Sequence, residues 1–175
     1  MVVVSTILKG LANSASLSDT MLKWLNLSAV VIVLDQISKW LMMNWLDLHE
    51  TVAVLPSFNL TLAHNYGAAF SFLASAGGWQ RWFFVVLALA ISTALIIWLK
   101  RLGAYAKLEA ASLALILGGA IGNVIDRLIH GYVIDFLDVY YGSYHWPAFN
   151  IADSAICVGA VLLIFDSFRS KTEPQ

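Results

Sequence analysis

Four long apolar runs, separated by shorter polar segments, set the pattern of this chain. They cover residues 25–46, 82–99, 108–125 and 148–168. Each run is long enough to cross the ~30 Å hydrocarbon core of a bilayer as a helix. The third run contains Gly118 and Gly122, a Gly-x-x-x-Gly spacing that lets another helix approach closely. The pattern therefore predicts a membrane protein, an all-α bundle of four transmembrane helices.

A second pattern, with a period of two residues, lies between the first and second runs. Apolar residues recur there at even positions, interrupted by Pro56: Val52, Val54, Phe58, Leu60 and Leu62. Such alternation is typical of strands. We expect a small β-sheet of two or three strands outside the bilayer, leaning on the membrane surface or on the helix ends. Residues 65–78, rich in small and aromatic side chains, either close over a site or float at the interface.

The distribution of positively charged residues predicts how the bundle is oriented in the membrane. Four spans place both termini on one side of the membrane, and that side holds most of the positive charge: Lys9, Lys23, Lys100, Arg101, Lys107, Arg169 and Lys171. The opposite side holds Arg81, with Arg127 at a helix end. By the positive-inside rule we expect both termini to be cytoplasmic.

The order of these segments gives the domain organisation. Residues 1–24 begin with an apolar run too short for the core of a signal peptide, so we interpret them as a flexible cytoplasmic extension. Residues 25–168 form a single four-span domain with outward-facing insertions at 47–79 and 127–147, the second of them a loop. Residues 169–175 form a cytoplasmic tail.

Composition supports this class of protein and excludes others. Hydrophobic residues make up 60% of the chain and charged residues 12%, and the mean hydropathy is +0.78. A net charge of −1 without a basic patch excludes nucleic acid as a partner. Cys157 is the only cysteine, so no internal disulfide can form. No HExxH or CxxC spacing is present, so no metal or other cofactor is expected; the histidines are His49, His64, His130 and His145.

Acidic and amide side chains gather at the outer ends of the third and fourth runs. Asp135 and Asp153 stand out among them because each is flanked by apolar residues. Two carboxyl groups brought close at the membrane edge cannot both ionise cheaply, so one keeps a proton near neutral pH. Such a pair supplies an acid and a base for the attack of water on a peptide bond, as in aspartic proteases. A purely structural pair is the alternative.

Other polar residues of this cluster have structural interpretations beside chemical ones. Asp126 is followed at once by Arg127, which favours a role as a charge partner or helix cap over one in the chemistry. Asp138 is interpreted as a solvated interfacial charge. Asn123 and Asn150 either orient a substrate or cap helix ends, and the sequence leaves both roles open.

One further charged pair lies inside the first run. Asp35 and Lys39 are spaced i,i+4, which puts them on one helical face where they neutralise each other. We interpret them as a buried structural pair, with a direct catalytic role as the alternative. Buried acids would also suit a proton-coupled transporter or assembly factor. The absence of an internal repeat argues against the usual transporter design.

Five segments of the chain resemble, in order and spacing, the bacterial lipoprotein signal peptidases, also called signal peptidase II. They are Asp35-Gln36 with Lys39, NYGAAF at 65–70, GGAIGNVIDR at 118–127, VIDF at 133–136 and FNIAD at 149–153. The resemblance extends over residues 25–168, nearly the whole chain. Each segment alone is a weak signal, and their common order makes the signal specific. The N-terminal extension departs from the family pattern.

The resemblance implies an aspartyl endopeptidase of the bacterial inner membrane with its active site on the periplasmic side. Such an enzyme removes the signal peptide of a diacylglyceryl-modified prolipoprotein on the N-terminal side of the lipidated cysteine. Its partners would be these substrates and membrane lipid, and it would act as a monomer. The small sheet would form a cradle on the membrane surface. Asp135 and Asp153 would be the catalytic dyad, with a substrate-binding or supporting set of Asn65, Gly67, Asn123, Asp126, Arg127 and Asn150.

Overall fold

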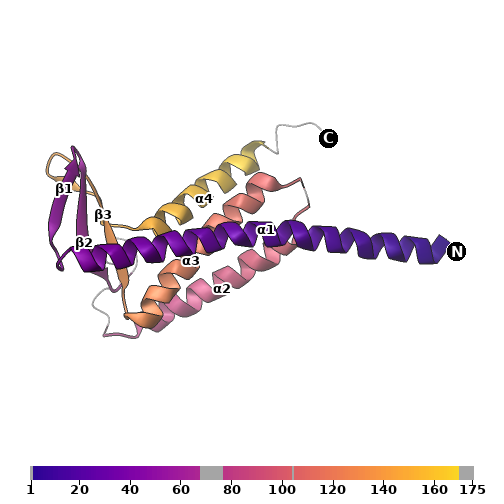
Figure 1. Cartoon of the computed structure of the whole chain (residues 1–175), viewed down its shortest axis with the longest axis horizontal. Coiled ribbons are helices and arrows are strands. Elements are labelled where there is room, and N and C mark those ends of the chain that lie inside the picture. Colours follow the sequence, from indigo (N-terminus) through magenta and orange to yellow (C-terminus); the bar gives the residue numbers. More distant parts are fainter. Residues whose placement is uncertain (1, 68–76, 104, 170–175) are drawn as a thin grey trace.

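Four long helices and a small sheet form the part of the chain that the structure, a computed structural model, describes: residues 2–67, 77–103 and 105–169. The helices are α1 (Val2–Trp45), α2 (Gln80–Arg101), α3 (Lys107–Ile129) and α4 (Ile151–Arg169). Figure 1 shows the sheet at one end of the bundle, with the start of α1 and the end of α4 towards the other.

Each helix has a segment long and apolar enough to span a membrane. These segments are Lys23–Trp45, Gln80–Arg101, Lys107–Ile129 and Ile151–Arg169. The predicted four-span architecture is therefore confirmed, and the chain is a multi-pass membrane protein. Its polypeptide needs helices there because the hydrocarbon offers no partner for free backbone N–H and C=O groups.

The first helix is longer than the sequence suggested. α1 begins at Val2 and continues without interruption through the extension that we expected to be flexible. Residues 1–24 contain no proline, so the sequence has no strong helix breaker between this segment and the first span. In Figure 1 the start of α1 projects beyond the other three helices.

The sheet has four antiparallel strands in the order β1-β2-β3-β4. The predicted pair, β1 (Thr51–Leu55) and β2 (Phe58–Asn65), is present. The second insertion, which we expected to be a loop, adds β3 (Val133–Tyr141) and β4 (Tyr144–His145). The first four residues of β3 are buried, so the apolar and polar alternation of a half-exposed strand is missing from the sequence.

The structure contradicts the interpretation of Asp138 as a solvated charge. Its carboxylate is buried and accepts a hydrogen bond from Asn59 Nδ2 on β2 at 2.9 Å. His145 Nδ1 on β4 lies 2.8 Å from the same carboxylate. Asp138 therefore joins three strands, and the pairing of β2 with β3, which sets Asn59 opposite Asp138, explains why.

Helix α3 lies at the centre of the bundle and packs against each of the other three helices. Glycines of α3 allow the backbones of α1 and α4 to approach it closely. A Cβ atom at Gly118 would lie 2.8 Å from the carbonyl oxygen of Ser28 on α1, and one at Gly119 would collide with the carbonyl oxygen of Ala152 on α4. A Cβ at Gly122 would meet the carboxylate of Asp35 at 2.7 Å. This packing brings polar residues of α1, α3 and α4 together at the sheet end of the bundle.

Candidate active site

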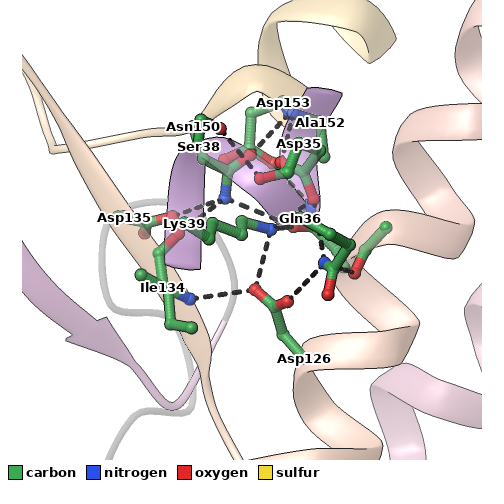
Figure 2. A network of polar contacts seen from close by, with 12 residues as sticks. Asp35, Gln36, Ser38, Lys39, Asp126, Ile134, Asp135, Asn150, Ala152 and Asp153 are labelled. Atoms are coloured by element: carbon green, nitrogen blue, oxygen red, sulfur yellow. Dashed lines mark hydrogen bonds and ion pairs between the residues drawn. The ribbon is translucent and has the colours of Figure 1, made fainter. Parts of the chain in front are cut away.

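The residues predicted from the sequence meet where the sheet joins the helices. Asp35 and Lys39 come from α1, and Asn150 precedes α4, which carries Asp153. Asn123, Asp126 and Arg127 lie near the end of α3, and Asp135 lies on β3. Asn65 is the last residue of β2, and Gly67 lies two residues further along the chain. Figure 2 shows Asp135 and Asp153 beside one polar network that includes Lys39 and Asp126. Residues 68–76, within the segment expected either to close over a site or to float, lie outside the described residues.

Three asparagine amides hold the two candidate aspartates. Asp135 accepts hydrogen bonds on both oxygens, from Asn150 Nδ2 at 2.7 Å and from Asn65 Nδ2 at 3.0 Å. Asp153 Oδ1 accepts one from Asn123 Nδ2 at 2.8 Å. Asn150 Nδ2 also lies 3.3 Å from Asn123 Oδ1, so the two amides connect one carboxyl group to the other.

The orientation of each amide is fixed by a group that can only donate. Asn123 Oδ1 accepts a hydrogen bond from Lys39 Nζ at 3.1 Å. Asn150 Oδ1 accepts one from the backbone N–H of Asp153 at 2.8 Å, and Asn65 Oδ1 accepts one from that of Gly67 at 3.0 Å. Because each amide oxygen is engaged, each NH₂ group must face a carboxyl group. Asn150 therefore serves as the N-terminal cap of α4 and as a donor to Asp135 at once.

The surroundings of Asp135 favour its protonated form. Burial and the negative charge of Asp153 raise the pKa of Asp135 to about 7, although Asn65, Lys39 and Asn150 act in the opposite direction. Interacting carboxyl groups titrate as a pair. The pair of Asp135 and Asp153 thus retains one proton up to near-neutral pH, which gives it an acid and a base.

Lys39 is the centre of the buried network behind the aspartates. Its ammonium group lies 2.8 Å from Asp35 Oδ2 and 2.7 Å from Asp126 Oδ2, and all three side chains are at most 1% exposed (Figure 2). The expected i,i+4 pair is thus present and buried. The partner of Asp126 is Lys39 on another helix, and the expected partner, Arg127, forms no ion pair with it within the described ranges. Adjacent residues of a helix point in different directions, which explains the difference.

Arg127 connects the end of β2 to α3. It donates to the carbonyl oxygens of Gly67 at 2.9 Å and of Asn123 at 3.2 Å. Its guanidinium carbon also lies 5.1 Å from the centroid of the Phe84 ring on α2. Arg127 therefore fixes the end of the strand that carries Asn65, beside Asp135.

No group of three or more histidine, cysteine, aspartate or glutamate side chains suited to a metal ion occurs within 2–67, 77–103 and 105–169. His64 instead stacks on Tyr132, with ring centroids 3.9 Å apart, and His130 lies 5.8 Å from the same ring. These rings pack on each other at the sheet end of the bundle.

Comparison with known proteins decides the family. The family model described as Signal peptidase (SPase) II matches residues 27–169. The chain belongs to the signal peptidase II family. Lipoprotein signal peptidases of Alteromonas mediterranea and Photorhabdus laumondii are each 55% identical, covering 87% and 89% of this chain and 84% and 93% of theirs. A bacterial membrane enzyme solved by the in meso method at 2.3 Å resolution has a TM-score of 0.79 at 28% identity, covering 87% of this chain and 92% of its own.

Membership of the signal peptidase II family confirms the expectation of an aspartic endopeptidase and disfavours a transporter or assembly factor.

One polar residue of this site, Gln36, entered the sequence analysis only as part of a motif. Gln36 Nε2 donates to Asp126 Oδ1 at 2.8 Å and lies 3.2 Å from Asp35 Oδ2, so it links the two acids that bind Lys39. Its spacing of i,i+3 from Lys39 places both side chains on one face of α1, and this spacing is the signal by which the sequence could have identified Gln36.

Proposed function

We propose that this chain cleaves the signal peptide of diacylglyceryl-modified prolipoproteins, on the N-terminal side of the lipidated cysteine, with Asp135 and Asp153 as its catalytic dyad. The observation that carries the proposal is the pair of carboxyl groups at the sheet end of the bundle, each oriented by asparagine amides. The curated relatives with which the chain shares 52 to 55% identity are named lipoprotein signal peptidases.

The proposed chemistry needs one proton on the pair. The ionised aspartate takes a proton from a water molecule while the water oxygen attacks the carbonyl carbon of the scissile bond. The protonated aspartate donates its proton to the developing oxyanion, which gives a neutral tetrahedral intermediate. Collapse of this intermediate breaks the C–N bond: the leaving nitrogen takes the proton held by the first aspartate, and one hydroxyl group of the intermediate returns a proton to the second aspartate as the new carbonyl forms. The pair then again holds a single proton.

We also propose an orientation in the bacterial inner membrane. The dyad lies at the sheet end of the bundle, and Lys100, Arg101 and Lys107 lie around the α2–α3 turn at the other end. The positive-inside rule places that turn, the extension 1–24 and the tail 169–175 in the cytoplasm, and the dyad on the periplasmic side. A diacylated cysteine anchored in the outer leaflet would meet the dyad there, and this anchoring supplies orientation and local concentration. We propose that a monomer suffices, because one chain carries both aspartates.

The lipid requirement can be tested on the purified protein in nanodiscs. A prolipoprotein carrying diacylglyceryl on its cysteine should be cleaved at least about tenfold faster than the same polypeptide without the lipid, because anchoring replaces a bimolecular encounter. Mass spectrometry should find the lipidated cysteine as the new N-terminus. A substrate with serine in place of that cysteine is the control. Equal cleavage of the lipidated and unlipidated substrates, or cleavage at another bond, would contradict the proposed substrate.

The pH dependence of kcat/KM should have an alkaline limb near neutrality. The pKa of Asp135 is about 7, so a rise of pH through that value removes the last proton of the pair and the rate falls. Initial rates at concentrations of lipidated substrate well below KM, with folding monitored by tryptophan fluorescence, measure this limb. Asn65→Leu removes a donor that lowers the pKa of Asp135, so its limb should move to higher pH. A rate that keeps rising well above pH 7 would exclude this assignment of the proton.

A further inference from the structure

The two acids that bind Lys39 also bind the backbone beside the proposed dyad. Asp35 Oδ1 accepts a hydrogen bond from the backbone N–H of Ala152 at 2.9 Å, and Ala152 immediately precedes Asp153. Asp126 Oδ2 accepts one from the backbone N–H of Ile134 at 3.1 Å. Ile134 immediately precedes Asp135, the other member of the dyad (Figure 2). Each acid thus holds the backbone next to one dyad residue.

Lys39 joins these two contacts into one unit. Its ammonium group has three N–H donors. They reach Asp35 Oδ2 at 2.8 Å, Asp126 Oδ2 at 2.7 Å and Asn123 Oδ1 at 3.1 Å. The third contact continues to the dyad as well, because Asn123 donates to Asp153. A buried ammonium between two carboxylates is costly to desolvate, and a packed apolar side chain would often serve stability as well.

We propose that Lys39, with Asp35 and Asp126, is a positioning group that sets the separation and orientation of Asp135 and Asp153. The unit touches neither the water nor the scissile bond, so its members are not catalytic residues. A displacement of a reacting group by about 1 Å can cost about 10²-fold in rate, so a unit that fixes both backbones affects kcat directly. The proposal rests on the proposed function of the dyad.

The contacts predict that the two acids respond differently to asparagine. Asp35 uses a different carboxylate oxygen for each contact: Oδ2 accepts from Lys39 Nζ, and Oδ1 accepts from the backbone N–H of Ala152. An asparagine has a single oxygen and can keep only one of these contacts. Asp126 uses Oδ2 for both Lys39 and the N–H of Ile134, so an asparagine there can keep both. Only the Gln36 amide, which faces Asp126 Oδ1, has to turn.

The test compares Lys39→Met, Asp35→Asn and Asp126→Asn, with Ser28→Ala as the matched control. Ser28 is a buried residue of α1 that bonds to α3 through the carbonyl oxygen of Ala114, away from the dyad. For each variant, kcat and KM for a lipidated prolipoprotein are measured per folded molecule, counted by size-exclusion chromatography. We expect kcat to fall about 10- to 100-fold in Lys39→Met and Asp35→Asn and about threefold in Asp126→Asn, with KM within about twofold. Ser28→Ala should lower thermal stability and leave kcat unchanged.

A merely structural role predicts another result, in which the variants lose folded protein and each folded molecule keeps its normal kcat. That result for Asp35→Asn would overturn the proposal. Should Lys39→Met fail to accumulate, the comparison at positions 35 and 126 decides, and a kcat for Asp35→Asn at least as high as that for Asp126→Asn overturns it. A failure of the proposed function gives a different result from a failure of this positioning role. If the dyad is wrong, Asp135→Asn or Asp153→Asn still cleaves the substrate, whatever the activity of the Lys39 variant.

Discussion

Asp135→Asn and Asp153→Asn should each reduce cleavage of a diacylated prolipoprotein by at least about 10³-fold, while folded protein still accumulates. Asparagine has nearly the size of aspartate but cannot exchange a proton. With either residue changed, the pair can no longer hold an acid and a base at the same time. Release of the signal peptide, measured per folded molecule in lipid nanodiscs, gives the rate.

The two variants should differ in stability, which separates folding from chemistry. Both oxygens of Asp135 accept amide donors, so an asparagine there leaves one buried donor without a partner, at a cost of about 1–3 kcal/mol. Asp153 can keep its bond from Asn123 after the change to asparagine. Asp166→Asn, at the far end of the same helix, is the control for the loss of a negative charge and should retain normal cleavage. Near-normal activity of either dyad variant would remove that residue from the dyad.

Gly119→Leu should prevent accumulation of folded enzyme, and Gly119→Ala should destabilise it by about 3 kcal/mol or more. A Cβ atom at this position would collide with the carbonyl oxygen of Ala152 and lie 2.7 Å from the side chain of Ile156. Backbone cannot move aside as a flexible side chain can, so α3 and α4 would have to separate. Thermal unfolding in detergent and the yield of monodisperse protein measure the effect.

Gly103→Ala is the matched control for this effect, because no heavy atom of the described residues, other than those of its chain neighbours, lies within 4 Å of the added Cβ. It should leave both the yield and the thermal stability of the protein unchanged. An unaltered unfolding temperature for Gly119→Ala would show that α3 and α4 can separate at little cost. The surviving Gly119→Ala enzyme should also lose activity, since Ala152 directly precedes Asp153.

The sequence predicts the helices well because the bilayer dictates their length. An apolar run of about 20 residues has few alternatives to a spanning helix, whatever its neighbours are. The period of two residues in 51–65 likewise marks strands that are exposed on one side. The burial of β3 at its start removes that period, so the strand that carries Asp135 could not be recognised from the pattern.

The ion-pair and hydrogen-bond partners within the site are harder to predict, because they depend on contacts between segments that are far apart in the sequence. The choice of Lys39 over Arg127 as the partner of Asp126 follows from the packing of α1 on α3, which no local pattern encodes. Asn59 and His145, the partners of Asp138, become neighbours only when β2, β3 and β4 pair. The candidate aspartates were accessible to sequence reasoning because ionisable residues beside apolar runs are costly and therefore conspicuous.

The fixed asparagine amides have a consequence for proton movement. Each hydrogen bond that the described residues make to the side chains of Asp135 and Asp153 comes from an amide N–H group. An amide N–H is not acidic enough to pass a proton on, so this lining insulates the pair from the ammonium behind it. The proton that the pair must hold is therefore exchanged with water or with the substrate, and not with Lys39 through these amides.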